Sequence, residues 1–189
     1  MTTSGRIELM APAGNFESMQ AALDNGCDSI YFGVEQLNMR ARATVNFVLD
    51  DLPEIARRCN EKNVRTYLTL NTIIYDHDLS IVKTLLTKAK EAGITAVIAS
   101  DQAVIMTART MGMEVHISTQ LNVTNIETVK FYAMFADTIV LSRELSLRQV
   151  KKITDDIEKE QIKGPSGNLV EIEIFGHGAL CMAVSGKCY

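Results

Sequence analysis

LMAPAGNFESMQAALDNGCDSIYFG, residues 9–33, decides the class of fold that this sequence predicts. Apolar runs of strand length stand on both sides of a segment with helical period. Asn15 is placed as the N-cap of that helix and Gly26 as its C-cap. A strand–helix–strand unit of this kind builds a parallel sheet. Its turn lacks Gly-x-Gly-x-x-Gly, which favours a (β/α) barrel over a dinucleotide-binding sheet.

The same alternation continues to the end of the sequence. Asp76 and Asn125 are N-cap candidates of later helices, and Gly93 and Gly112 are C-cap candidates. Six helices separate seven predicted strands, at residues 7–13, 28–34, 65–71, 96–100, 114–119, 137–142 and 169–175.

A complete barrel of eight units typically needs about 250 residues. We therefore expect an α/β fold of the (β/α)8 TIM type, truncated after the seventh strand, with residues 1–189 as the N-terminal part of the barrel domain. The remainder of the barrel and any C-terminal domain would be absent. A flavodoxin-like open sheet is the alternative fold.

Composition limits the functions that fit. The net charge is -4 with 22% charged residues, which argues against a basic face that grips nucleic acid through many phosphates. No apolar run is long enough to span a bilayer, and the start lacks the features of a signal peptide, so we expect a cytoplasmic protein without a membrane partner. An unclosed barrel exposes its first and seventh strands, and we expect self-association through these edges.

Polar residues gather where the predicted strands end, which in a barrel is one shared mouth. By alternation, His116, Ser118 and Gln120 share one face of a strand, and a wet mouth explains three polar groups there better than a dry core does. The candidate catalytic residues are His116, Gln120, Asn122, Arg143, Glu144 and His177, and Asn71 and Asp101 are candidate substrate ligands.

Each of these residues also has a structural interpretation. Asp101 would cap the helix that begins near Ala103, and Glu144 would pair with a neighbouring arginine. His116 would be a satisfied core histidine.

Two arginines, Arg40 and Arg42, lie in the longest predicted loop on the mouth side, residues 35–47. Arginine holds phosphate or carboxylate with two parallel hydrogen bonds, so on an acidic protein the pair predicts an anionic substrate group. Solvated loop charges are the alternative. The sequence contains no Gly-x-Ser-x-Gly elbow, His-Glu-x-x-His helix or P-loop.

The four cysteines fall into two kinds. Cys27 and Cys59 lie in apolar runs and are expected to be buried, inert thiols. Cys181 and Cys188 are separated by six residues in GALCMAVSGKCY. In a helix they would face the same way about 10 Å apart, beyond the roughly 7 Å limit of a disulfide, which suits a shared metal site. Iron–sulfur clusters usually need four thiolates, and C-x6-C alone is a weak pattern.

Several segments together resemble the collagenase-like peptidase family of uncertain catalytic type, number thirty-two under letter U. The ending EIEIFGHGALCMAVSGKC is similar to its signature, and residues 9–33 look like its opening unit. RARATVNF resembles its arginine-bearing loop, and HISTQLNVTN and TVKFYAMFADTIVLSRELSL resemble its fifth and sixth units. Within the family the sequence looks most like the bacterial tRNA uridine hydroxylation branch.

The resemblance implies oxygen-independent hydroxylation of a wobble uridine, with tRNA and a small anion such as prephenate as partners. It also implies an iron–sulfur cluster, of the 4Fe-4S type, in the intact protein, with Cys181 and Cys188 as two of its ligands. We expect the cluster to be absent from these 189 residues alone. A peptidase is the main alternative, and a non-catalytic binding or maturation partner is the second.

Overall fold

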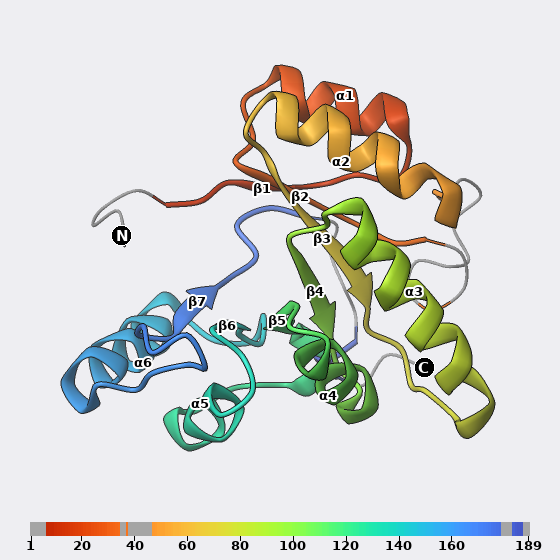
Figure 1. The fold of residues 1–189 in the computed structure, drawn as a ribbon. Helices are drawn as coiled ribbons and strands as arrows, with labels where there is room; N and C mark the ends of the chain where they lie inside the picture. Colours follow the sequence, from red (N-terminus) through yellow and green to blue (C-terminus); the bar gives the residue numbers. More distant parts are fainter. Residues whose placement is uncertain (1–6, 35–36, 38–46, 179–182, 187–189) are drawn as a thin grey trace. The chain divides into compact units, whose positions relative to one another are not determined.

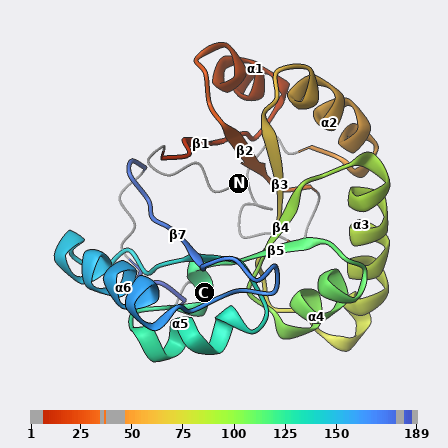
Figure 2. The ribbon, with the colours of Figure 1, turned by 60° about the vertical axis from the view of Figure 1, so that its left-hand side comes forward.

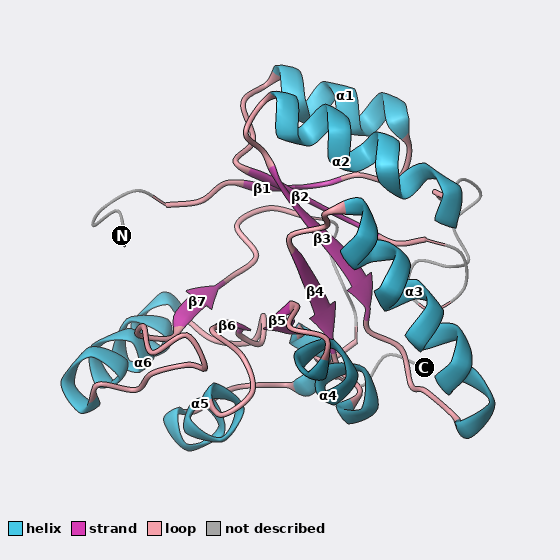
Figure 3. Ribbon diagram, in the orientation of Figure 1, coloured by secondary structure: helices cyan, strands magenta, loops and turns pink. Residues whose placement is uncertain are grey.

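The computed structural model describes residues 7–34, 37, 47–178 and 183–186. Strands and helices alternate along the chain, as Figure 3 shows. All seven predicted strands are present but shorter than expected, namely β1 (Met10–Pro12), β2 (Ser29–Phe32), β3 (Arg65–Leu70), β4 (Ala96–Ala99), β5 (Glu114–Ile117), β6 (Thr138–Val140) and β7 (Glu171–Glu173). The six α-helices are α1 (Phe16–Asp24), α2 (Leu52–Glu61), α3 (Leu79–Ala92), α4 (Gln102–Thr110), α5 (Ile126–Ala133) and α6 (Leu147–Glu160).

The strands follow one another in the sheet in the order of the sequence. β1 pairs with β2, β2 with β3, β5 with β6 and β6 with β7, each in parallel. Parallel strands joined in sequence order by helices are the arrangement of the TIM-barrel class, which confirms the predicted fold class.

The chain divides into two compact units. The first comprises Met1–Leu70 and Tyr75–Ala96, and the second comprises Asn71–Ile74 and Val97–Tyr189. In the first unit α1 and α2 lie side by side in both Figure 1 and Figure 2. In the second unit α5 contacts α6, and the two helices are neighbours in both views.

Each unit has its own apolar core. In the first unit, fully buried residues on β2 and β3 pack with the inward faces of α2 and α3, among them Ile30, Leu68, Ile55 and Leu86. In the second unit Ile117 pairs with Ile139, and both side chains are fully buried. Burial of such side chains stabilises a fold by about 1.5–3 kcal/mol each.

Local signals explain where most helices begin and end. The Asn15 side chain accepts a hydrogen bond from Ser18 N at 2.8 Å, and Asn125 caps α5 in the same way. Gly93 ends α3 with φ of 81°, in the left-handed region that favours glycine. The prediction that Asp76 caps α3 was wrong, because a 3-10 turn over Asp76–Asp78 precedes that helix and its N-cap is Asp78.

None of the helices that the structure describes is long and apolar enough to cross a bilayer.

Candidate active site at the ends of β5 and β6

The His116 side chain is buried on β5 and lies beside two carboxylates. Its Nε2 is 3.0 Å from Glu114 Oε1, and its Nδ1 is 3.8 Å from Glu173 Oε2 on β7. Burial by itself lowers the pKa of an imidazole, but the two carboxylates outweigh it and the pKa of His116 is raised. With 3% exposure His116 does not lie on a wet face. This burial fits the alternative of a core histidine, and a catalytic role of His116 stays a prediction.

The chain turns as soon as β5 ends. Ser118 caps the 3-10 turn η3 (Thr119–Leu121), and its hydroxyl accepts a hydrogen bond from Gln120 N at 3.3 Å. The predicted strand to residue 119 is therefore too long, and Gln120 leaves the strand face expected for it. The turn ends at Asn122, whose φ is 52°. Ser142 Oγ donates to Asn122 Oδ1 at 2.7 Å, which ties η3 to the end of β6.

Asn71 and Asp101 both contact other parts of the second unit. Asn71 Nδ2 lies 3.4 Å from Ser118 Oγ, so this amide is close to the end of β5. Asp101 Oδ1 accepts a hydrogen bond from Ala103 N at 2.8 Å, and its Oδ2 accepts one from Ile74 N at 3.3 Å. The capping interpretation of Asp101 is confirmed, while a role of either residue in substrate binding stays a prediction.

The loop after β6 places Arg143 and Glu144 against the Ser185 turn, which we define as residues 183–186. Ser185 N donates to Glu144 Oε1 at 2.8 Å. Arg143 N and Nε lie 3.4 and 3.5 Å from Ser185 Oγ, and the guanidinium carbon is 5.8 Å from the centre of the Phe175 ring. The Ser185 backbone N–H is the main cause that holds the pKa of Glu144 below its usual value, and burial acts in the opposite direction. These contacts fix the direction of a cation that is exposed to solvent.

Gly186 brings the same turn against η3. A Cβ at this position would lie 2.5 Å from Gln120 O and 3.2 Å from Asn122 Cβ, and the φ of Gly186 is 75°. Only glycine meets both conditions without displacement. The structure thus brings together four of the predicted site residues around one turn, namely Gln120, Asn122, Arg143 and Glu144.

Five other predicted residues remain, and the structure describes one of them, His177. His177 is exposed in the segment after β7. Arg40 and Arg42, and the cysteines Cys181 and Cys188, lie outside the described residues. Their assigned roles stay predictions.

Three residues that contact the predicted site residues were not predicted from the sequence. Ser185 is fully buried, and its position between the two cysteines of the terminal motif was the signal that could have indicated it. Glu114 and Glu173 flank His116, and Glu114-x-His116 places both side chains on one strand face. That spacing could have predicted the ion pair.

Burial of two cysteines limits which thiols of this chain can act as metal ligands. Burial raises the pKa of the Cys59 thiol to about 11 and also raises that of Cys27, so neither is suited to act as a thiolate ligand. Among the described residues no group of three or more His, Cys, Asp or Glu is arranged to hold a metal ion. Clusters usually need four thiolates, and the roles of Cys181 and Cys188 as two of them stay a prediction.

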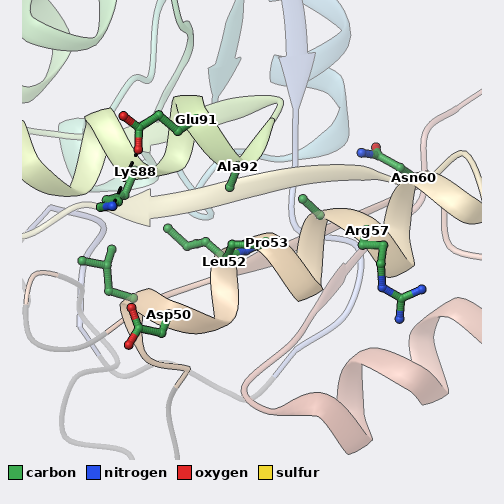
Figure 4. A pocket seen from close by; sticks show the side chains of 10 residues that line it. Asp50, Leu52, Pro53, Arg57, Asn60, Lys88, Glu91 and Ala92 are labelled. Atoms are coloured by element: carbon green, nitrogen blue, oxygen red, sulfur yellow. Dashed lines mark ion pairs between the residues drawn. The ribbon is translucent and has the colours of Figure 1, made fainter.

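A separate hollow of about 430 Å³ lies between α2 and α3 in the first unit (Figure 4). Its charges are already matched, because Arg57 pairs with Glu54 and Glu61, and Lys88 lies 3.7 Å from Glu91. A hollow without an excess charge offers little to an anionic ligand. Its lining residues are Leu49, Asp50, Leu52, Pro53, Ala56, Arg57, Asn60, Lys88, Glu91 and Ala92, none of which is a predicted site residue.

The fold and the cluster define an α/β protein of the TIM-barrel class with polar side chains at the strand ends. A solved U32 peptidase, Mk0906, has the same fold, with a TM-score of 0.66 at 14% identity over 92% of this chain and 70% of that chain. The model of "Peptidase family U32" matches residues 14–189, and the chain belongs to this family.

Relatives in the family have different names. A protein of Porphyromonas gingivalis W83 named "Collagenase" is 53% identical over 97% of this chain and 44% of its own length. A protein of Helicobacter pylori 26695 named "tRNA hydroxylation protein P" is 34% identical over 97% of this chain and 42% of its own length. The chain spans less than half the length of either relative.

Proposed function

We propose that the protein of which this chain is part hydroxylates a uridine of tRNA without using molecular oxygen, in the cytoplasm. The observation that carries the proposal is the convergence of two strand-end loops on the Ser185 turn, because this turn lies in the sequence between Cys181 and Cys188. The relatives named as tRNA hydroxylation proteins support the same substrate class.

Hydroxylation of uridine requires an electron acceptor and side chains that orient the base. Replacing a C–H bond by C–OH with the oxygen of water releases two protons and two electrons, so the reaction also needs an external two-electron acceptor. An iron–sulfur cluster would pass these electrons on when bound, with Cys181 and Cys188 among its ligands. Asn122 and Gln120 carry amides that can donate and accept hydrogen bonds at a base edge.

An anionic co-substrate such as prephenate needs a fixed cation. Arg143 is suited to this role, because Ser185 and Phe175 hold its guanidinium in one direction. Arg40 and Arg42 are proposed to bind the same class of group from the loop at residues 35–47. His116 is buried too deeply to touch a substrate, and we propose that it supports the strands instead of acting in the reaction.

A peptidase is the second candidate, favoured by the 53% identity to the protein named "Collagenase". A histidine can act as the general base for a nucleophile only in its neutral form. His116 lies between two carboxylates that favour its charged form, which is unsuited to that role. His177 remains the candidate base for this alternative.

The test uses a strain in which the gene is deleted and then restored. We expect hydroxyuridine in tRNA, measured by mass spectrometry, to disappear on deletion and to return with the wild type. It should fall at least about tenfold with Cys181→Ser and Arg143→Ala. Arg148→Ala, an exposed arginine on α6, is the matched control.

Two further results decide between the candidates. Unchanged hydroxyuridine in the deletion strain would remove the RNA assignment. Peptide release from collagen that is lost with His177→Ala but kept with Cys181→Ser would establish the peptidase instead. Hydroxyuridine that disappears on deletion but survives every substitution, without peptide release from collagen, would make the protein a binding or maturation partner.

A further inference from the structure

Hydrogen bonds connect the Ser185 turn to the loop after β6 and to η3. Ser185 is fully buried although its side chain is polar. Its hydrogen bonds must therefore offset the cost of removing this polar group from water. Val184, next to it, is 54% exposed. The turn is therefore held by polar contacts instead of apolar packing.

Two segments supply those contacts, the loop after β6 and η3, and both belong to the second unit. Glu144, after β6, accepts the Ser185 backbone N–H at 2.8 Å, a length typical of a strong charge-assisted bond. Thr119, in η3, donates to Ser185 Oγ at 3.5 Å, and Arg143 approaches the same oxygen through its N and Nε. The carboxylate contact is the shortest and the only one that carries a charge on the acceptor.

Gly186 adds a steric condition on the other side of the turn. Its backbone approaches Gln120 O so closely that no Cβ fits, and its positive φ also disfavours any other residue. The turn thus lies between the Glu144 carboxylate, which accepts a hydrogen bond from Ser185 N, and the Gln120 carbonyl, which excludes a Cβ at Gly186. Such an arrangement defines one position for the backbone.

We propose that Glu144 is a positioning residue, whose carboxylate fastens the Ser185 turn to the ends of β5 and β6 and thereby sets the direction of Arg143. The carboxylate does not touch substrate in this role. The fastening stands on the contacts alone, and its consequence for the reaction rests on the proposed function. The turn lies in the sequence between Cys181 and Cys188, so the same contacts fasten a segment that the two proposed cluster ligands flank.

Hydrogen exchange of the purified protein, measured by mass spectrometry on peptides that cover residues 176–189, tests the fastening. We expect Glu144→Ala to speed exchange at the Ser185 turn about tenfold, and Glu144→Gln, which keeps an acceptor oxygen, to restore most of the protection. Glu158→Ala removes an exposed carboxylate of α6 and should change nothing. Equal protection in the wild type and Glu144→Ala would overturn the proposal.

A pair of glycine variants separates the close approach from simple backbone strain. Gly186→Ala should speed exchange at the turn, because its Cβ would overlap Gln120 O. Gly167→Ala has a similar φ of 82° but no atom within 4 Å of its Cβ, so exchange in its own turn, residues 164–168, should report strain alone and change less. If each variant speeds exchange in its own turn equally, the contact with Gln120 does not position the Ser185 turn.

Hydroxyuridine in tRNA, measured in the same Glu144 variants, tests the consequence of the fastening for the reaction. If the proposed function holds, Glu144→Ala should lower tRNA hydroxyuridine and Glu144→Gln should rescue it, while the melting temperature stays within about 2 °C of the wild type. Faster exchange without any RNA activity in the wild type would leave the fastening intact and reject the proposed function. Slow exchange in Glu144→Ala with lost activity would assign Glu144 to the chemistry and overturn its positioning role.

Discussion

At the scale of single residues, surroundings decide what a side chain can do. His116 and His177 are both histidines near strand ends, but one is 3% exposed beside two carboxylates and the other faces solvent. Glu144 is exposed and still has a lowered pKa, because a backbone N–H is directed at it. Residue type alone does not separate these cases, since the difference comes from neighbours that are distant in sequence.

His116 leads to a prediction about pH. Its pKa is raised in the folded protein, so its ion pairs contribute fully below the unfolded value of about 6.5 and are lost as pH rises through the folded value. In urea unfolding at pH 6 we expect His116→Gln to cost about 2 kcal/mol, and less at pH 8.5. The exposed His77→Gln is the control and should show no such trend. A cost for His116→Gln that grows with pH would contradict the ion pairs.

At the scale of elements, hydrogen bonds from turns help to hold the short strands in place. β6 and β7 each have three residues, but the turn between α6 and β7 is attached to the start of β6 at several points. Asp137 Oδ1 accepts hydrogen bonds from Ser166 N at 3.0 Å and from Ser166 Oγ at 2.7 Å. Residues 163–168 therefore lie beside the start of β6, at the opposite end of this strand from Arg143 and Glu144.

Gly164 in that turn gives the second prediction. A Cβ there would lie 2.8 Å from Asp137 Cα, which is backbone and cannot move aside. We expect Gly164→Ala to lower the free energy of unfolding by about 1–3 kcal/mol, measured by urea titration. Gly176→Ala is the control, because nothing lies within 4 Å of its Cβ. Equal effects of the two substitutions would show that the turn does not need this close approach.

At the scale of the whole molecule, the thiols of Cys27 and Cys59 are buried deeply enough for their reaction with a thiol reagent to report unfolding. Cys27 is 7% exposed and Cys59 is fully buried, as the sequence predicted. In a variant with Cys181→Ser and Cys188→Ser, we expect these two thiols to react with a thiol reagent at pH 8 at least about 100-fold more slowly than in urea. Fast labelling of the folded protein would contradict their burial.

The two strands that end the sheet order give the last prediction. β1 and β7 each pair on one side among the described residues, and exposed apolar side chains lie beside them, Ile7 at 90% and Ile174 at 45%. We expect the 189-residue chain to associate with rising concentration in sedimentation experiments. Ile7→Lys with Ile174→Lys should reduce this association, and Met106→Lys on α4 should not. A monomer at all concentrations would contradict association through the strand edges.

The sequence by itself determined the order and type of the elements, because hydrophobic period and capping residues act over a few neighbouring positions. Seven strands and six helices, the caps at Asn15 and Asn125, and the inert cysteines all follow from such local signals. The sequence also named Gln120, Asn122, Arg143 and Glu144 as strand-end residues.

Only the tertiary structure decided which of those residues meet. Ser185 lies 41 positions after Glu144 in the sequence, and no local pattern links them. Ser118 caps the turn that follows the end of β5 at Ile117, and the second carboxylate beside His116 comes from Glu173 on another strand. Contacts between distant segments form only when the sheet brings strand ends together, and for that reason the Ser185 turn and the role of Glu144 appear in the fold and not in the sequence.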